Sequence, residues 1–153
     1  MFRLLSSAGL ASVGLALALA TAAHAESHTV QMYSAHPTDP SKVNSFDPPL
    51  LRIAPGDGVT FVPANPSHNS ASKKGMIPEG AEAWNSGVDE EFTVTLTTEG
   101  VYGYICSPHY EMCMVGLIVV GDPAANLEAA RKVRHIGAAK KVFRDLFAQL
   151  EEG

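Results

Sequence analysis

Short stretches of alternating apolar and polar residues recur along residues 26–122, and Pro, Gly, Asn or Asp bound most of them. Alternation with a period of two places every second side chain on one face, which is typical of a half-buried β-strand. Short strands at such spacing, with turn residues between them, indicate a β-sandwich. The strands predicted in this way are residues 28–34, 50–53, 58–62, 91–97, 101–106 and 114–120.

The stretches between these strands predict loops. Residues 35–49 contain four prolines, and residues 65–74 are polar and interrupted by Pro66, so both are expected to lack regular structure. Residues 81–85 are expected to form one short helical turn that holds Trp84.

The pattern changes to helical spacing after Gly121. Asp122 can cap a helix that has Pro123 at its first position, and Gly137 separates this helix from a second one. We expect the two helices to pack together and onto the sandwich, with no chemistry of their own. The second helix carries an apolar stripe at i, i+4 and i+8 that consists of Val142, Phe143, Leu146, Phe147 and Leu150.

The first 25 residues are predicted to be a secretory signal. Arg3 provides a positive start, residues 8–20 are apolar, and Ala23-His24-Ala25 fits a small-x-small cleavage site. The apolar run is too short for a lasting membrane span. The expected organisation is a signal over 1–25, cleaved after Ala25, a sandwich over 26–122 and a two-helix extension of the same domain over 123–153.

The charge of the chain is acidic and uneven. The net charge is −5, with 4 basic and 12 acidic residues in 26–122 but 6 basic and 4 acidic residues in 123–153. This balance excludes a basic nucleic-acid footprint. No nucleophile–base pair stands out, so an enzyme is not expected.

The two cysteines, Cys106 and Cys113, permit two interpretations. In an exported protein the plain one is a disulfide. That bridge would close a very small loop, where chain-entropy stabilisation is least, and it would consume the thiolate between two strands. Metal binding by Cys106 is the favoured interpretation.

A thiolate, an imidazole and a thioether lie together between the apolar runs 101–105 and 115–120. These are Cys106, His109 and Met114, and Pro108 stiffens the turn between the first two. One thiolate, two imidazoles and a weak methionine sulfur make an electron-transfer copper site. Met112 competes with Met114 as the methionine ligand.

The second imidazole must come from elsewhere in the chain. The position of His68 in a loop after a predicted strand favours it by elimination, but spacing alone leaves the choice open. The other candidates are His28, His36 and His135.

These motifs resemble those of the cupredoxins, and the Lys74–Pro78 segment and two-helix tail resemble the pseudoazurins in particular. The resemblance extends from Val30 to the C-terminus. It rests on Pro55-Gly56-Asp57, His68-Asn69, Gly75-Met76-Ile77-Pro78, Gly100-Val101-Tyr102-Gly103, Cys106-Ser107-Pro108-His109-Tyr110 and Met114-Val115-Gly116.

The resemblance implies a mainly β fold, a Greek-key sandwich with two C-terminal α-helices, and one copper ion that alternates between Cu(II) and Cu(I). It implies His68, Cys106 and His109 as a trigonal ligand set with Met114 as the long axial ligand. It also implies that Asn69 ties the His68 loop to the Cys106 loop and donates a backbone hydrogen bond to the thiolate.

The function implied is that of a soluble, monomeric one-electron carrier of the periplasm. Its expected partners are redox proteins: a cytochrome donor and a respiratory reductase, such as copper nitrite reductase of denitrification. The alternative is a copper storage or delivery protein, and a metal-free sandwich with a Cys106–Cys113 bridge is a third possibility.

The surface around His109 departs from the family pattern. Only Lys73 and Lys74 remain near it, and Glu111 and Cys113 stand where glycines are frequent. Cys113 is interpreted as an inert thiol rather than as a rival ligand or a disulfide partner. We expect His109 to reach the surface within an apolar patch formed by Pro66, Pro108, Tyr110, Met112 and either Met32 or Met76.

Overall fold

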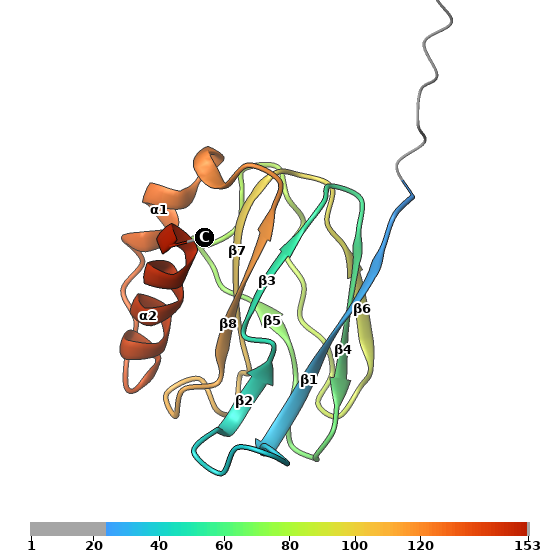
Figure 1. Ribbon diagram of the computed structural model, residues 1–153, viewed down its shortest axis with the longest axis vertical. Helices are drawn as coiled ribbons and strands as arrows, with labels where there is room; N and C mark the ends of the chain where they lie inside the picture. The colour runs from blue at the N-terminus through green and yellow to red at the C-terminus, as the bar shows by residue number, and fades with distance from the viewer. Residues whose placement is uncertain (1–23, 153) are drawn as a thin grey trace, which may run out of the picture.

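The computed structural model describes residues 24–152, so the predicted signal lies outside the described residues except for His24 and Ala25. Two sheets face each other, and two helices cover the outside of one of them (Figure 1). The strands are β1 (Ser27–Ala35), β2 (Val43–Asp47), β3 (Leu50–Ile53), β4 (Gly58–Pro63), β5 (Ala71–Ser72), β6 (Phe92–Thr95), β7 (Gly100–Ile105) and β8 (Val115–Val120). A 3-10 turn (Pro123–Ala125) precedes the helices α1 (Leu127–Arg131) and α2 (Ala139–Glu152).

Both sheets contain parallel and antiparallel pairs. The first has the order β2-β1-β4-β6, with β1 parallel to β4, and the second has the order β3-β8-β7-β5, with β3 parallel to β8. In each parallel pair the chain leaves the end of one strand and must cross to the opposite end of the sheet before it begins the partner strand. Here it makes these crossings by way of strands in the other sheet. The predicted fold class, a mainly β sandwich with two C-terminal helices, is confirmed.

Alternation along the strands fills the space between the sheets. Val30 and Met32 of β1 are fully buried, and they meet the rings of Phe61 and Tyr104 in one apolar cluster. The ring of Tyr104 lies 5.1 Å from Phe61 and 4.7 Å from Phe46, both edge-on. These rings pack between the sheets near the end of β7, and their close packing makes that end of the sandwich rigid.

Three sequence predictions about loops and turns are wrong. Residues 43–47, predicted as loop, form β2 and pair with β1, and residues 71–72 form β5. Residues 81–85 are irregular rather than helical, with an isolated bridge from Asn85 to Ala71, because the Trp84 backbone is hydrogen-bonded to Ser72 and its indole N–H donates to Ser70 Oγ at 3.0 Å. Tertiary contacts therefore override the local preference in that segment.

The C-terminal residues cover the second sheet. Asp122 Oδ1 accepts a hydrogen bond from Ala124 N at 2.9 Å, which confirms the predicted cap, although it starts a 3-10 turn. The stripe of α2 is buried at Phe143, Leu146, Phe147 and Leu150 and packs into one cluster with β8. The Arg52 guanidinium donates to the carbonyl of Leu150 at 2.8 Å and fastens the end of α2 to β3.

Asp57 ties the start of β1 to the turn before β4. This side chain is 4% exposed and accepts hydrogen bonds from Glu26 N at 2.8 Å and Ala54 N at 2.9 Å, with His28 Nε2 at 3.0 Å. These donors, the Glu26 N–H first, hold the pKa of Asp57 below its ordinary value. Among residues 24–152, neither helix has the long apolar stretch that a bilayer-spanning helix requires.

Candidate metal centre

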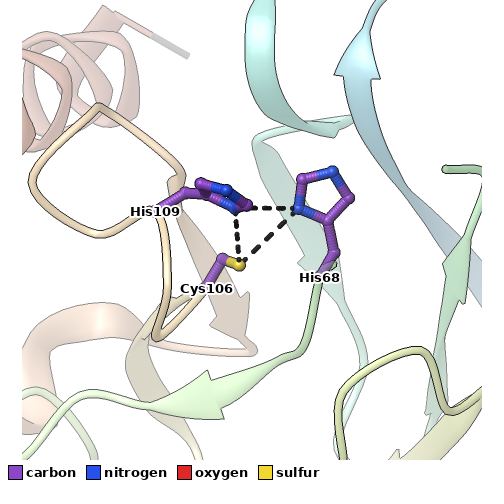
Figure 2. Close-up of side chains that lie close together, drawn as sticks. All are labelled: His68, Cys106 and His109. Carbon is purple, nitrogen blue, oxygen red and sulfur yellow. Dashed lines mark hydrogen bonds between the residues drawn. The ribbon is translucent and has the colours of Figure 1, made fainter. Parts of the chain in front are cut away.

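The side chains of His68, Cys106 and His109 converge at one end of the sandwich (Figure 2). The Nδ1 atoms of His68 and His109 are 3.1 Å apart. The Cys106 sulfur lies 3.7 Å from His68 Nδ1 and 3.5 Å from His109 Nδ1. A point in the plane of these atoms lies about 2.0 Å from all three, close to the bond length between a transition metal and an imidazole nitrogen. One soft sulfur and two imidazoles around such a point fit copper.

The His68 loop is held by residues that are distant in the sequence. Ser34, near the end of β1, places its Oγ 2.9 Å from His68 Nε2, which leaves Nδ1 facing Cys106 and His109. Asp89 Oδ1 accepts the backbone N–H groups of Ser67 and His68, at 2.5 and 3.3 Å. A hydrogen bond on the remote ring nitrogen is the usual way to fix the orientation of a metal-binding histidine.

The Cys106 loop is held mainly by its own backbone. Cys106 N donates to Met114 O at 3.0 Å, His109 N donates to Cys106 O at 3.2 Å, and Met114 N donates to His109 O at 3.2 Å. Cys106 follows the last residue of β7 and Met114 precedes the first residue of β8, so the hairpin sets the separation of the loop ends. Pro108 lies exposed at the turn.

Asn69 joins the two loops. Its Oδ1 accepts the Ser107 backbone N–H at 2.7 Å, and its Nδ2 donates to Ser107 Oγ and to the Ser86 carbonyl, both at 3.3 Å. Its backbone N–H is also directed to the Cys106 sulfur. The predicted bridge between the loops is therefore present in the structure.

The two methionines of the loop lie in different surroundings. Met114 is fully buried in the same cluster as Cys106, whereas Met112 is 55% exposed and its sulfur lies 3.7 Å from Asn44 Nδ2. Met112 therefore faces away from the core, which favours Met114 of the two candidates.

The two cysteines are separate, free thiols. Cys113 is only partly buried and directs its sulfur toward the carbonyl of Val43 at 3.4 Å. The disulfide interpretation is contradicted, and the sulfur of Cys106 remains available to the site.

Burial decides the protonation of the two groups at the base of the site. Desolvation, and then the nearby His109 ring, lower the pKa of His68, so this imidazole is neutral and able to bind a metal at neutral pH. Desolvation raises the pKa of the Cys106 thiol, while the backbone N–H of Asn69 opposes that rise. The thiol therefore needs a cation beside it to ionise readily.

The surface above the site agrees only partly with the predicted apolar patch. His109 and Tyr110 are partly exposed, and Pro66, Pro108 and Met112 are exposed. Met32 and Met76 are fully buried, so the prediction that one of them belongs to the patch is wrong. Met32 packs between the sheets, whereas Met76 packs against Gly103 of β7 in the cluster that the second sheet shares with the helices. Lys73 places its ammonium 4.5 Å from the centre of the Tyr110 ring, at the edge of this surface.

Comparison with known proteins gives one consistent result. The profile described as "Copper binding proteins, plastocyanin/azurin family" matches residues 37–121. The pseudoazurin of Methylorubrum extorquens is 42% identical over 144 residues, which cover 93% of this chain and 95% of the relative. The pseudoazurin of Paracoccus pantotrophus is 40% identical over 124 residues, which cover 81% of this chain and 83% of the relative. A solved pseudoazurin from Sinorhizobium is 45% identical and superposes with a TM-score of 0.79, covering 84% of this chain and 98% of that one.

Proposed function

The chain belongs to the pseudoazurins of the plastocyanin/azurin family of copper-binding proteins, and we propose that His68, Cys106, His109 and Met114 hold one copper ion that carries single electrons. The observation that supports this proposal most strongly is the convergence of two imidazole nitrogens and one thiol sulfur around a point about 2.0 Å from each. Copper bound there supplies a Cu(II)/Cu(I) couple.

The three converging residues are assigned as the trigonal ligands, and Met114 as the axial one. Their buried setting supports this assignment, because His68, Cys106 and Met114 are all 0% exposed. The hydrogen bonds between Ser34 and His68 and between Ser107 N–H and Asn69 Oδ1 hold the ligand side chains in place, so the ligand frame would change little between oxidation states. A rigid frame lowers the barrier to electron transfer, and a set of four protein ligands favours a carrier over an enzyme.

His109 is assigned as the point where electrons enter and leave. It is the one member of the converging trio that is partly exposed, and the exposed Pro108 and Met112 lie in the same loop. A small and partly apolar surface of this kind suits brief encounters with a redox partner.

The proposed setting is the periplasm, reached by means of a signal that is cleaved after Ala25. We propose that the protein works there as a monomer between a cytochrome donor and a respiratory reductase, such as a copper nitrite reductase. The support is the sequence of residues 1–25 and the family membership. The reoxidation rate of the reduced protein, measured with a copper nitrite reductase, tests the choice of acceptor.

Spectroscopy and voltammetry of the copper-loaded protein test the central proposal. We expect an intense visible thiolate-to-copper band and a reversible one-electron couple. A copper storage or delivery protein is the alternative function. It would instead give up Cu(I) rapidly to a competing chelator, and the absence of the band would contradict the ligand assignment itself.

A further inference from the structure

The first strand begins beside a buried carboxylate, at the end of the sandwich opposite the proposed copper site (Figure 1). Asp57 is 4% exposed, and its Oδ1 accepts the Glu26 backbone N–H at 2.8 Å. Glu26 is exposed and directly precedes β1. The proposed cleavage after Ala25 would therefore break the peptide bond whose nitrogen already bonds to this carboxylate.

The position of the Glu26 nitrogen is set by the residues that follow it. The Glu26 carbonyl accepts the Gly58 N–H at 2.9 Å, and Ser27 is paired with Gly58 in the parallel ladder between β1 and β4. His24 and Ala25 are exposed and belong to no strand or helix. Their removal would thus leave the nitrogen beside the carboxylate.

Hydrolysis of the Ala25–Glu26 bond would change the charge of this nitrogen. One water molecule is consumed, Ala25 leaves with the new carboxylate, and the Glu26 nitrogen is protonated to an ammonium at neutral pH. Coulombic attraction is thereby added to an existing hydrogen bond. That attraction is larger near a protein surface than in bulk water, because the effective dielectric constant is lower.

The two oxygens of the Asp57 carboxylate have different partners. Oδ2 accepts the Ala54 N–H at 2.9 Å and lies 3.0 Å from His28 Nε2. Within residues 24–152, Glu26 N is the one hydrogen-bond partner of Oδ1. Since a carboxylate oxygen has two lone pairs, Oδ1 can accept a second N–H of an ammonium.

Four ionisable side chains line the hollow beside this carboxylate, and they are His24, Glu26, His28 and Arg52. The Arg52 guanidinium of β3 is bonded to the Leu150 carbonyl at 2.8 Å, and cleavage would release His24 with the signal. His28 of β1 faces Oδ2 rather than Oδ1. The terminal ammonium would therefore be the cation closest to Oδ1 in the mature chain.

We propose that removal of the signal creates an ion pair between the new terminal ammonium of Glu26 and Asp57, which fastens β1 to the turn before β4 in the mature chain. The inference rests on the proposed cleavage after Ala25 and not on copper binding. In the precursor the same nitrogen is an uncharged amide. Maturation therefore adds stability that the unprocessed chain lacks.

The pH dependence of this pair has a definite sign. An ammonium that gains an anionic partner on folding has its pKa raised above the ordinary value of about 7.7–8.0. Its contribution to stability is present below the unfolded-state pKa and is lost as pH rises through the folded-state pKa.

Mass spectrometry tests the first step. The full chain is expressed with its signal, recovered after export and loaded with copper, and we expect Glu26 at its N-terminus. An uncleaved chain or another first residue would overturn the inference. The thiolate-to-copper band of the same sample would report separately on the proposed function.

A double-mutant cycle tests the ion pair itself. The comparison protein carries one extra glycine before Glu26, so Glu26 keeps an N–H while the ammonium moves one residue outward. Urea denaturation at pH 7, with the metal in the same state in every sample, should give an unfolding constant about threefold larger for the extended chain. In Asp57→Asn the two chains should unfold alike, because the partner charge is absent.

Asp39→Asn is the matched control for the cycle. It removes a carboxylate that accepts the Ser41 N–H in the loop after β1, so the threefold difference should persist. An NMR titration of the terminal ammonium is a second measurement, which remains possible if Asp57→Asn does not fold. It should give a pKa above about 8 in the mature protein.

Two results of these measurements would overturn the ion pair. One is a difference between the two chains that survives in Asp57→Asn, which would assign the effect to the extra residue alone. The other is a terminal ammonium that titrates at or below its ordinary value. Neither result depends on the copper site, so the proposed function would stand.

Discussion

The two loops that meet at the candidate metal centre are stabilised in opposite ways. The Cys106 loop is closed by hydrogen bonds between its own backbone groups, because Cys106, His109 and Met114 bond to one another over nine residues. The His68 loop depends on distant side chains instead, namely those of Ser34 and Asp89, 34 and 21 residues away. The conformation of the Cys106 loop is therefore set mainly by contacts within the loop, whereas that of the His68 loop is set by residues that only the folded protein brings near.

This difference shows which changes each loop should tolerate. A change at a distant residue can misplace His68 without touching any ligand, whereas the Cys106 loop should be affected mainly by changes within itself. There are two exceptions: Asn69, which belongs to the His68 loop and holds the Cys106 loop, and residues 135–138, which bond to Tyr110 and Glu111.

The largest expected effect comes from removing the sulfur of the self-contained loop. Cys106→Ser should abolish the visible thiolate-to-copper band, because serine oxygen does not replace a soft ligand. Cys113→Ser, a matched change in the same loop, should keep the band, because Cys113 directs its thiol to the Val43 carbonyl. Loss of the band in the Cys113 variant would contradict its interpretation as an inert thiol.

The bridge between the loops should come next in magnitude. Asn69→Leu leaves the Ser107 N–H without its acceptor and should lower the free energy of unfolding by about 1–3 kcal/mol. Urea denaturation of the copper-free protein would measure this loss. Asn85→Leu is the control: Asn85 is exposed, and Asn69 Nδ2 keeps its bonds to Ser86 and Ser107 without it. An equal loss in both variants would refute the bridge.

A distant partner of the His68 loop should have a smaller effect. Ser34→Ala removes the hydroxyl beside His68 Nε2, and we expect about a tenfold loss of copper affinity with little change in stability. Competition with a copper chelator would measure the affinity. Ser27→Ala, an exposed serine at the start of the same strand, should have no effect. An unchanged affinity in the Ser34 variant would mean that the loop holds its histidine unaided.

The smallest effect is expected at Asp57, whose hydrogen bonds lie outside both loops. Asp57 sits beside the start of β1, whereas Ser34 sits near its end, so the two are at opposite ends of the sandwich. The hydrogen bonds of Asp57 lower its pKa in the folded state. Its contribution is therefore present above the unfolded-state pKa of about 3.9 and is lost as pH falls through the lower folded value.

Urea midpoints at neutral and acidic pH would detect this contribution. The parent protein should lose more stability below about pH 4 than Asp57→Asn, which cannot titrate at this position. Equal losses would show that acid lability arises elsewhere, including at the metal loops.

The sequence predicted the locally determined features well. Alternation predicted the buried face of β1, and the spacing of Cys106, His109 and Met114 predicted the compact loop, because both depend on neighbours along the chain. His68 could not be chosen by spacing. Elimination favoured it and the family resemblance singled it out, whereas spacing did not, because its position is set by long-range contacts.

The features that the sequence did not predict share this dependence on distant contacts. Strand β2 has only two apolar residues, Val43 and Phe46, and is recognisable only through its pairing with β1. Asp89 accepts backbone hydrogen bonds from Ser67 and His68, and nothing in the local pattern distinguishes it from an ordinary surface charge. His135 was predicted to lie in a helical tail without chemistry, and nothing in the local pattern indicated that it contacts Tyr110.

The helical extension also bears on the copper loop. Ala138 N donates to the Glu111 carbonyl at 2.8 Å, and His135 meets the Tyr110 hydroxyl, so two consecutive loop residues rest against residues 135–138. The extension thus acts as an external brace. A truncation after Gly121 would leave every strand of both sheets in the chain but remove that brace. In the shortened protein the loop that carries His109, the proposed point of electron entry and exit, would be held less firmly. Comparisons with cupredoxins that lack the helices should allow for that difference in loop rigidity.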